Sequence, residues 1–262
     1  MNGIIEIGVI QLFAAYIFLI ILLAITRRQG IGKEKEILIS SLRMTIQLII
    51  MGYVLVYMFT VNHYLLSIGA LVFMEYFAIR NIYSRIKVKI NRRLRKVISL
   101  SMISGTTLTI LFFLLVVIGL SPWYETRYFI PIAGMIIGNS MTGISLGAER
   151  LIDGIKNRKD LVEGALMLGA TPERATKSIV NDAFTAAILP TINSMVGMGI
   201  VFLPGMMTGQ ILSGVSPLTA IEYQIAIMLG IMGSVSLTVF VMVQLGYKTF
   251  FNERSQLEYG EL

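Results

Sequence analysis

Few side chains in this sequence can do chemistry, and those that can lie within long apolar segments. The chain has no Cys and His63 is its only His, which excludes disulfides, thiolate metal sites, iron–sulfur clusters and zinc sites built from His clusters. Glu75 is the clearest candidate, because it stands in the otherwise apolar run 73–76. A carboxylate inside a membrane is costly and usually faces the bundle interior, where it binds a cation or pairs with a basic residue such as Arg80 or Arg43. A structural role at a helix contact near the cytoplasmic end is the alternative.

Amide, hydroxyl and thioether side chains in similar segments extend this set. Carboxylate and amide oxygens suit Fe(II), whereas thioethers suit soft ions such as Cu(I). Met is also a common apolar filler, and Asn139 can equally bond to a neighbouring helix. The candidate substrate pathway consists of Glu75, Gln47, Asn139, Met141, Thr142, Asn193, Met206, Met207 and Gln210, and within it Glu75 and Asn139 are the candidate metal ligands.

The sequence lacks the motifs of an enzyme. It contains no Gly-rich loop ending in Lys-Ser or Lys-Thr, so we expect no ATP site on this chain. No nucleophile–base pair is visible, and a single His leaves little room for acid–base catalysis near neutral pH. We therefore expect no catalytic residues.

Membrane-spanning helices must position the candidate residues. Of the 262 residues, 55% are hydrophobic and 14% charged, against about 45–50% and about 25% in soluble domains. A spanning helix needs about 20 apolar residues. The sequence predicts an all-α, polytopic helix bundle in the cell (plasma or inner) membrane, formed by one permease domain over residues 1–262. Its seven predicted spans are roughly 4–26, 37–60, 62–83, 97–121, 128–149, 183–213 and 221–247.

Lys and Arg gather in alternate loops. Basic clusters follow the first, third, fifth and seventh spans, whereas the opposite loops hold only Arg127. Because cytoplasmic loops are rich in Lys and Arg, we expect the N-terminus outside and the C-terminus in the cytoplasm. Membrane orientation thus accounts for the net charge of +7, and no nucleic-acid partner is expected.

The sixth predicted span is too long for one crossing. Residues 183–213 would form a helix of about 45 Å, whereas the hydrocarbon core is about 30 Å thick. Pro190 and Pro204 lie within it, and Pro removes a helical hydrogen bond. A broken helix lining a transport site and a long tilted helix are the two interpretations.

The predicted cytoplasmic segment at about 155–178 has the pattern of a docking helix. Apolar residues share one face at helical spacing, and small residues allow close approach of a partner. Gly169 can end this helix, and Thr171-Pro172 can begin the next one, with Thr as N-cap. The candidate coupling residues are Leu161, Glu163, Gly164, Ala165, Leu168, Gly169, Ala170, Thr171 and Pro172.

This segment also carries a family resemblance. The pattern Glu163-Gly164-Ala165-x-x-x-Gly169 resembles the E-A-A-x-x-x-G signature of the permease subunits of ATP-binding-cassette transporters, although the Ile-x-Leu-Pro element that follows in that family is matched late and imperfectly by residues 188–190. Longer runs resemble the FetB-type permease family. They are residues 134–143, Glu149-Arg150, 163–172, 190–194 and 203–210, together with Arg43 and Gln47.

The resemblance implies the membrane subunit of an ATP-driven transporter, in a family that is similar to bacterial iron-export permeases and includes relatives in plant aluminium tolerance. It implies a homodimer docked on two copies of a cytoplasmic ATPase, which binds the ATP and Mg, while this chain binds no cofactor. The implied cargo is iron or another metal ion. A permease for another small substrate, such as a glutathione-like compound or an amino acid, and a secondary transporter or scaffold without an ATPase are the alternatives.

Overall fold

The computed structural model describes residues 7–86 and 90–258, which form helices and no β-sheet. The all-α fold is therefore as predicted. Contacts divide the chain into two units: unit 1 holds residues 1–62 and 212–214, and unit 2 holds residues 63–211 and 215–262. The single permease domain over residues 1–262 stays a prediction.

Unit 1 is built from apolar helices with little core of their own. These helices are α1 (Val9–Ala15), α2 (Ile17–Arg28) and α3 (Glu34–Val61). α1 and α2 together form a 20-residue candidate span, and the Tyr16 hydroxyl at their junction hydrogen-bonds Thr45 of α3. Most apolar side chains here are exposed, for example Ile10 at 86% and Leu48 at 65%. Such surfaces are stable against lipid tails, which are as apolar as Leu.

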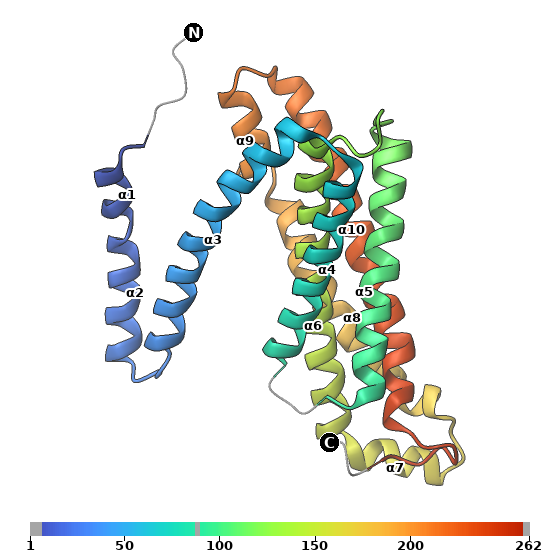
Figure 1. Cartoon of the computed structure of the whole chain (residues 1–262). Coiled ribbons are helices and arrows are strands. Elements are labelled where there is room, and N and C mark those ends of the chain that lie inside the picture. The colour runs from blue at the N-terminus through green and yellow to red at the C-terminus, as the bar shows by residue number, and fades with distance from the viewer. Residues whose placement is uncertain (1–6, 87–89, 259–262) are drawn as a thin grey trace. The chain divides into compact units, whose positions relative to one another are not determined.

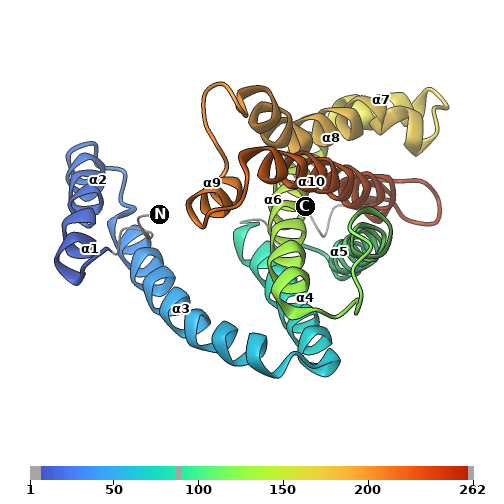
Figure 2. The same cartoon turned by 90° about the horizontal axis from the view of Figure 1, so that it is seen from above.

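Unit 2 is a helix bundle arranged around one central helix (Figure 1). Its elements are α4 (Tyr64–Arg85), α5 (Arg92–Phe112), the π-helical turn η1 (Phe113–Val117), α6 (Thr126–Asn157), α7 (Lys159–Met167), α8 (Pro172–Gly197), α9 (Gly205–Leu212, its last residue in unit 1), α10 (Pro217–Gly246) and the 3₁₀ turn η2 (Tyr247–Phe250). α6 contacts α4, α5, α8 and α10 and, seen from above, lies between α4 and the pair α8 and α10 (Figure 2). α7 lies across the end of the bundle at which α6 and α10 finish.

α6 buries apolar and small residues along most of its length. Ile144, Ala148, Leu151 and Ile155 have no exposed surface, and Phe129 is 2% exposed. Its charged residues gather toward the C-terminal end, for example Glu149 and Arg150, which are exposed, so the apolar part of the helix packs against its neighbours.

α6 contains two pairs of glycines four residues apart, Gly134 with Gly138 and Gly143 with Gly147, and the two pairs differ in how closely other helices approach them. A Cβ added at Gly143 would lie 2.8 Å from Cγ1 of Val235, and one at Gly147 would lie 2.9 Å from Cε of Met242, so α10 packs directly on the α6 backbone there. At Gly134 the nearest atom would be 4.0 Å away, and at Gly138 no atom lies within 4 Å. Close helix packing, which both pairs permit by sequence, thus occurs at the second pair.

The sixth predicted span is broken. α8 ends at Gly197, Met198 is extended, Gly199 has a φ of +83°, and α9 begins at Gly205. Pro190 lies inside α8 and does not end it. The interpretation as a broken helix is therefore correct, and the break lies at residues 198–204 rather than at the first proline.

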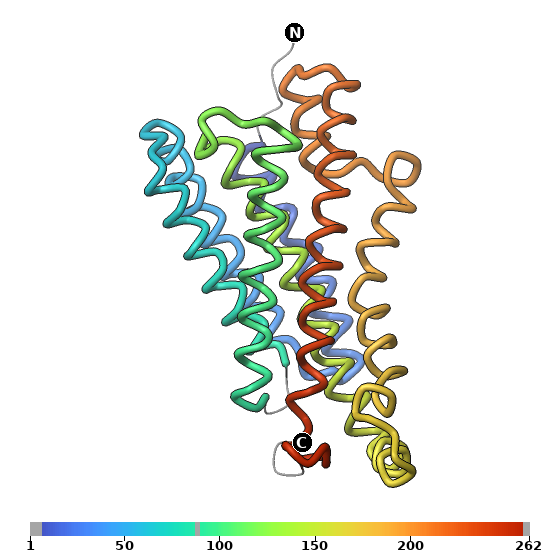
Figure 3. The backbone as a smooth tube through the Cα atoms, turned by 90° about the vertical axis from the view of Figure 1, so that its right-hand side faces the viewer, coloured from blue at the N-terminus to red at the C-terminus, as the bar shows by residue number. Residues whose placement is uncertain are grey.

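The described residues contain six helices that are long and apolar enough to cross a membrane, not the seven predicted. α8 is the missing one: it is long enough but is not apolar enough to be counted. It nevertheless runs between the same two ends of unit 2 as α6 and α10 (Figure 3). With α8 running this way, α7 and the end of α10 lie at the same end of the bundle. The basic residues near both segments predict that this end faces the cytoplasm.

The contact at Gly143 makes a prediction about stability. Gly143→Val should destabilise the chain by about 1–3 kcal/mol, because the added methyl groups overlap Val235 and Val239. Gly138→Val on the same helix should change stability by about 0.5 kcal/mol or less, since its Cβ meets open space. Thermal unfolding of the detergent-solubilised variants measures the difference, and equal losses would contradict the packing described.

Candidate functional site

The coupling segment forms a short helix held between two long ones. α6 ends at Asn157, Arg158 separates it from α7, and Gly169 follows α7 with a φ of +88°, which Gly adopts without strain. Thr171 then caps α8 by accepting a hydrogen bond from the Arg174 N–H at 3.4 Å, and Pro172 is the first residue of α8. The predicted helix end and helix start are both confirmed.

α7 is anchored on one face and exposed on the other. Val162 is 1% exposed, whereas Leu161 is 73%, Met167 86% and Leu168 90% exposed. Glu163, Gly164 and Ala165 are half-buried. Met167 was not among the sequence-predicted coupling residues, although its apolar side chain next to Leu168 was a visible signal.

An ion pair fixes the start of α7. The guanidinium of Arg158 lies 2.8 Å from the carboxylate of Asp182 on α8, and α7 also packs along α8. Both side chains are partly exposed, so the pair adds little stability and serves mainly to orient α7. α7 is thereby connected to both α6 and α8.

Glu75 lies within unit 2, between α4 and α5. It is 6% exposed, and the Thr106 hydroxyl of α5 donates to its Oε1. The same hydroxyl also donates to the Met102 carbonyl oxygen at 2.7 Å, and with one proton it serves one acceptor at a time. Among the described residues, Oε2 of Glu75 is buried without a hydrogen-bond partner. A carboxylate so placed is stabilised by binding a cation or a proton.

The partners expected for Glu75 were basic residues, and the observed one is a hydroxyl. Arg80 donates to the Tyr76 hydroxyl at 3.3 Å, and Arg43 belongs to unit 1. Thr106 was missed by the sequence prediction, because a lone Thr in an apolar helix usually bonds to its own backbone.

The remaining pathway residues are spread over several helices. Asn139 on α6 is exposed and its Nδ2 donates to the Met135 carbonyl oxygen at 2.8 Å, while Asn193 on α8 is exposed as well. Met141 and Thr142 on α6, and Met206 and Gln210 on α9, are half-buried, whereas Met207 is 7% exposed. Gln47 is exposed on α3, in unit 1, and its place in the pathway stays a prediction.

No ready-made metal cage is present in residues 7–86 and 90–258, where no three acidic or His side chains gather. No hydrogen bond joins Glu75 to Asn139 among these residues, and their role as metal ligands stays a prediction. The Glu75 carboxylate is the better candidate metal ligand of the two, because it is buried and one of its oxygens has no hydrogen-bond partner among the described residues.

Gln224 on α10 is a further buried polar group that the sequence prediction missed. It is 6% exposed, its Nε2 lies 3.7 Å from Sδ of Met198, and its Oε1 is buried without a hydrogen-bond partner in the described part of the chain. Its position in an otherwise apolar helix was the available signal. Gln224 thus connects α10 to the break between α8 and α9.

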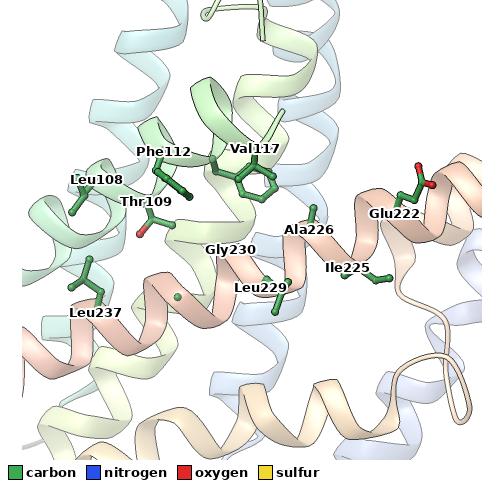
Figure 4. A pocket seen from close by; sticks show the side chains of 12 residues that line it. Leu108, Thr109, Phe112, Val117, Glu222, Ile225, Ala226, Leu229, Gly230 and Leu237 are labelled. Atoms are coloured by element: carbon green, nitrogen blue, oxygen red, sulfur yellow. The ribbon is translucent and has the colours of Figure 1, made fainter. Parts of the chain in front are cut away.

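A separate groove of about 800 Å³ lies between α5 with η1 and α10 (Figure 4). Its lining includes Phe112, Val117, Ile225 and Leu229, and Glu222 is its single charged residue. It contains no predicted pathway residue, and its apolar walls suit hydrocarbon rather than an ion.

The sequence is similar to known membrane proteins over nearly its whole length. The model of a family described as "Uncharacterised protein family (UPF0014)" matches residues 9–251. The chain is 34% identical over 252 residues to the Probable iron export permease protein FetB of Escherichia coli (strain K12), which covers 96% of this chain and 95% of that protein. No solved structure matches the chain.

Two further relatives come from distant organisms. The UPF0014 membrane protein YjkA of Bacillus subtilis (strain 168) is 34% identical over 252 residues, covering 96% of this chain and 99% of that protein. The protein ALUMINUM SENSITIVE 3 of Arabidopsis thaliana is 34% identical over 251 residues, covering 96% and 90%. The similarity thus extends over both units of the structure.

The Glu75–Thr106 hydrogen bond makes a prediction of its own. Thr106→Val should lower stability by about 1–3 kcal/mol, because it leaves a second carboxyl oxygen of Glu75 unpaired. Thr109→Val on the same helix removes only a hydroxyl that bonds the Gly105 carbonyl oxygen and should cost much less. In a Glu75→Met background the Thr106→Val penalty should largely vanish, as a double-mutant cycle by thermal unfolding would show. A penalty that persists there would mean that the two side chains are not coupled.

Proposed function

The chain belongs to the UPF0014 family and is a multi-pass membrane permease, and from this premise we propose that it is the membrane subunit of an ATP-binding-cassette exporter for iron or another metal ion. A separate cytoplasmic ATPase binds the ATP and Mg and drives transport. The permease acts as a homodimer on two ATPase copies.

The exposed face of α7 is the observation that carries the proposal. Leu161, Met167 and Leu168 are each at least 73% exposed at the end of the bundle where the basic residues gather. That end faces the cytoplasm by the Lys and Arg distribution. Apolar side chains clustered in water mark a protein contact, and these ones lie within the segment that resembles a coupling helix. A groove on the ATPase is the partner surface that fits them.

The connections of α7 supply the route from the ATPase to the transport pathway. α7 is joined directly to α6, is tied to α8 through Arg158 and Asp182, and is followed by the Thr171 cap of α8. A displacement of α7 therefore moves α6 and α8 as rigid bodies. These two helices carry Asn139, Thr142 and Asn193 from the candidate pathway.

The cargo is argued from Glu75 and from the relatives. A buried carboxylate with one unpaired oxygen attracts a cation, and oxygen ligands suit hard metal ions. The name of the Escherichia coli relative refers to iron export. Because the pathway offers few oxygen ligands, the metal ion makes brief contacts along it and is not held in a tight site.

The docking surface can be tested by replacing Leu168. Leu168→Asp should abolish co-purification of the ATPase in mild detergent, because it places a charge in the centre of the apolar contact. Ile200→Asp is the matched control, since Ile200 is 92% exposed in the 198–204 segment, outside α7. ATP hydrolysis in the eluate is the measurement, with membrane insertion checked for both variants. Retention of the ATPase by Leu168→Asp, or absence of any ATPase from the wild type, would contradict the proposal.

The cargo can be tested in the reconstituted complex. Fe²⁺ kept reduced should stimulate ATP hydrolysis, and Glu75→Gln should raise the half-maximal metal concentration at least about tenfold. Glu222→Gln, which changes an exposed carboxylate outside the pathway, should leave it unchanged. Stimulation by glutathione or an amino acid, with none by metal ions, would replace the metal assignment by another substrate.

A further inference from the structure

A polar cavity of about 390 Å³ lies between the first turns of α8 and the end of α10. Its lining includes Glu173, Arg174, Lys177, Asn181, Gln244 and Tyr247. The two helix ends that form it lie at the same end of unit 2 as α7 (Figure 1). The distribution of Lys and Arg places the cavity at the level of the cytoplasmic membrane surface.

The cavity concentrates positive potential. Arg174 and Lys177 stand three residues apart on one face of α8. Neither forms an ion pair within the part of the chain that the structure describes. α8 begins at Pro172, so the positive end of its helix dipole adds to the attraction for an anion.

The hydroxyl of Tyr247 is the second, independent observation. Tyr247 lines the cavity and is 6% exposed as a whole residue, and its hydroxyl has no hydrogen-bond partner in the described ranges. The hydroxyl oxygen is not among the fully buried unpaired atoms, so it is open to the cavity and can donate to a bound acceptor. Glu173, on the same cavity wall, offers an acceptor instead.

We propose that this cavity binds a phosphate group, with Arg174, Lys177 and the Tyr247 hydroxyl as its donors. Arg and Lys at the cytoplasmic surface between membrane helices are a setting in which anionic headgroups bind. Glu173 fits the hydroxyl or ammonium that a phospholipid headgroup carries beside its phosphate, and buried Val180 gives the cavity an apolar floor. A bound phosphate joins the start of α8 to the end of α10, next to the docking helix. This inference does not depend on the cargo or on the ATPase.

The experiment measures binding to the purified full-length chain in a non-ionic detergent. Native mass spectrometry follows dioctanoyl phosphatidylglycerol and dioctanoyl phosphatidylcholine, and equilibrium dialysis follows inorganic phosphate. Arg174→Gln/Lys177→Gln should weaken phosphatidylglycerol binding at least about tenfold, because two charge-assisted contacts are lost. Tyr247→Phe keeps the ring and should weaken it several-fold.

Arg85→Gln/Lys156→Gln is the matched control, since it removes two basic residues at the ends of α4 and α6 that do not line the cavity. This pair should bind phosphatidylglycerol as the wild type does. Saturable phosphatidylglycerol binding without phosphate binding identifies a lipid site, and binding of both with competition identifies a site for phosphate itself; either result supports the proposal. No saturable binding to the wild type, or equal losses in the two double variants, would overturn it. Because Arg174 and Lys177 are exposed, Arg174→Gln/Lys177→Gln should fold as the wild type does, and thermal unfolding checks this.

Discussion

The close approach of α6 to α8 and α10 is the constraint on which the rest of unit 2 depends. The absence of a side chain at Gly143 and Gly147 lets α10 reach the α6 backbone, and Gly154 allows the same contact with Ile179 of α8. The van der Waals contacts of such closely packed helices take the place of the hydrophobic driving force, which is absent between helices in lipid. This packing also joins α6, α8 and α10 into one closely packed set of helices.

The packing of α6 and α8 also gives the short helix α7 a fixed position. α7 has a single fully buried side chain, Val162, and would be marginal as an isolated helix. It is ordered because α6, the Arg158–Asp182 ion pair and the cap at Thr171 fix both of its ends. Its exposed apolar face is therefore presented in a defined orientation.

Buried polar groups are the second theme of the bundle. Ser140 and Ser234 satisfy each other across α6 and α10 at 2.9 Å, whereas Glu75 and Gln224 each keep a buried oxygen without a protein partner in the described residues. In a membrane interior such unpaired atoms are costly, which makes Glu75 and Gln224 the side chains to which the proposal of a transport pathway points first.

The sequence by itself determined the membrane location, the all-α fold, the helix end at Gly169 and the helix start at Thr171. It did so because apolar length, charge distribution and Gly, Thr and Pro chemistry act locally. Tertiary structure decided which glycines pack, since Gly138 and Gly143 look alike in sequence and differ only in whether α10 lies opposite. It also decided that the sixth span breaks at 198–204 and not at Pro190, and that Glu75 pairs with Thr106 and not with a basic residue. These outcomes depend on contacts between residues distant in the chain, which no local pattern encodes.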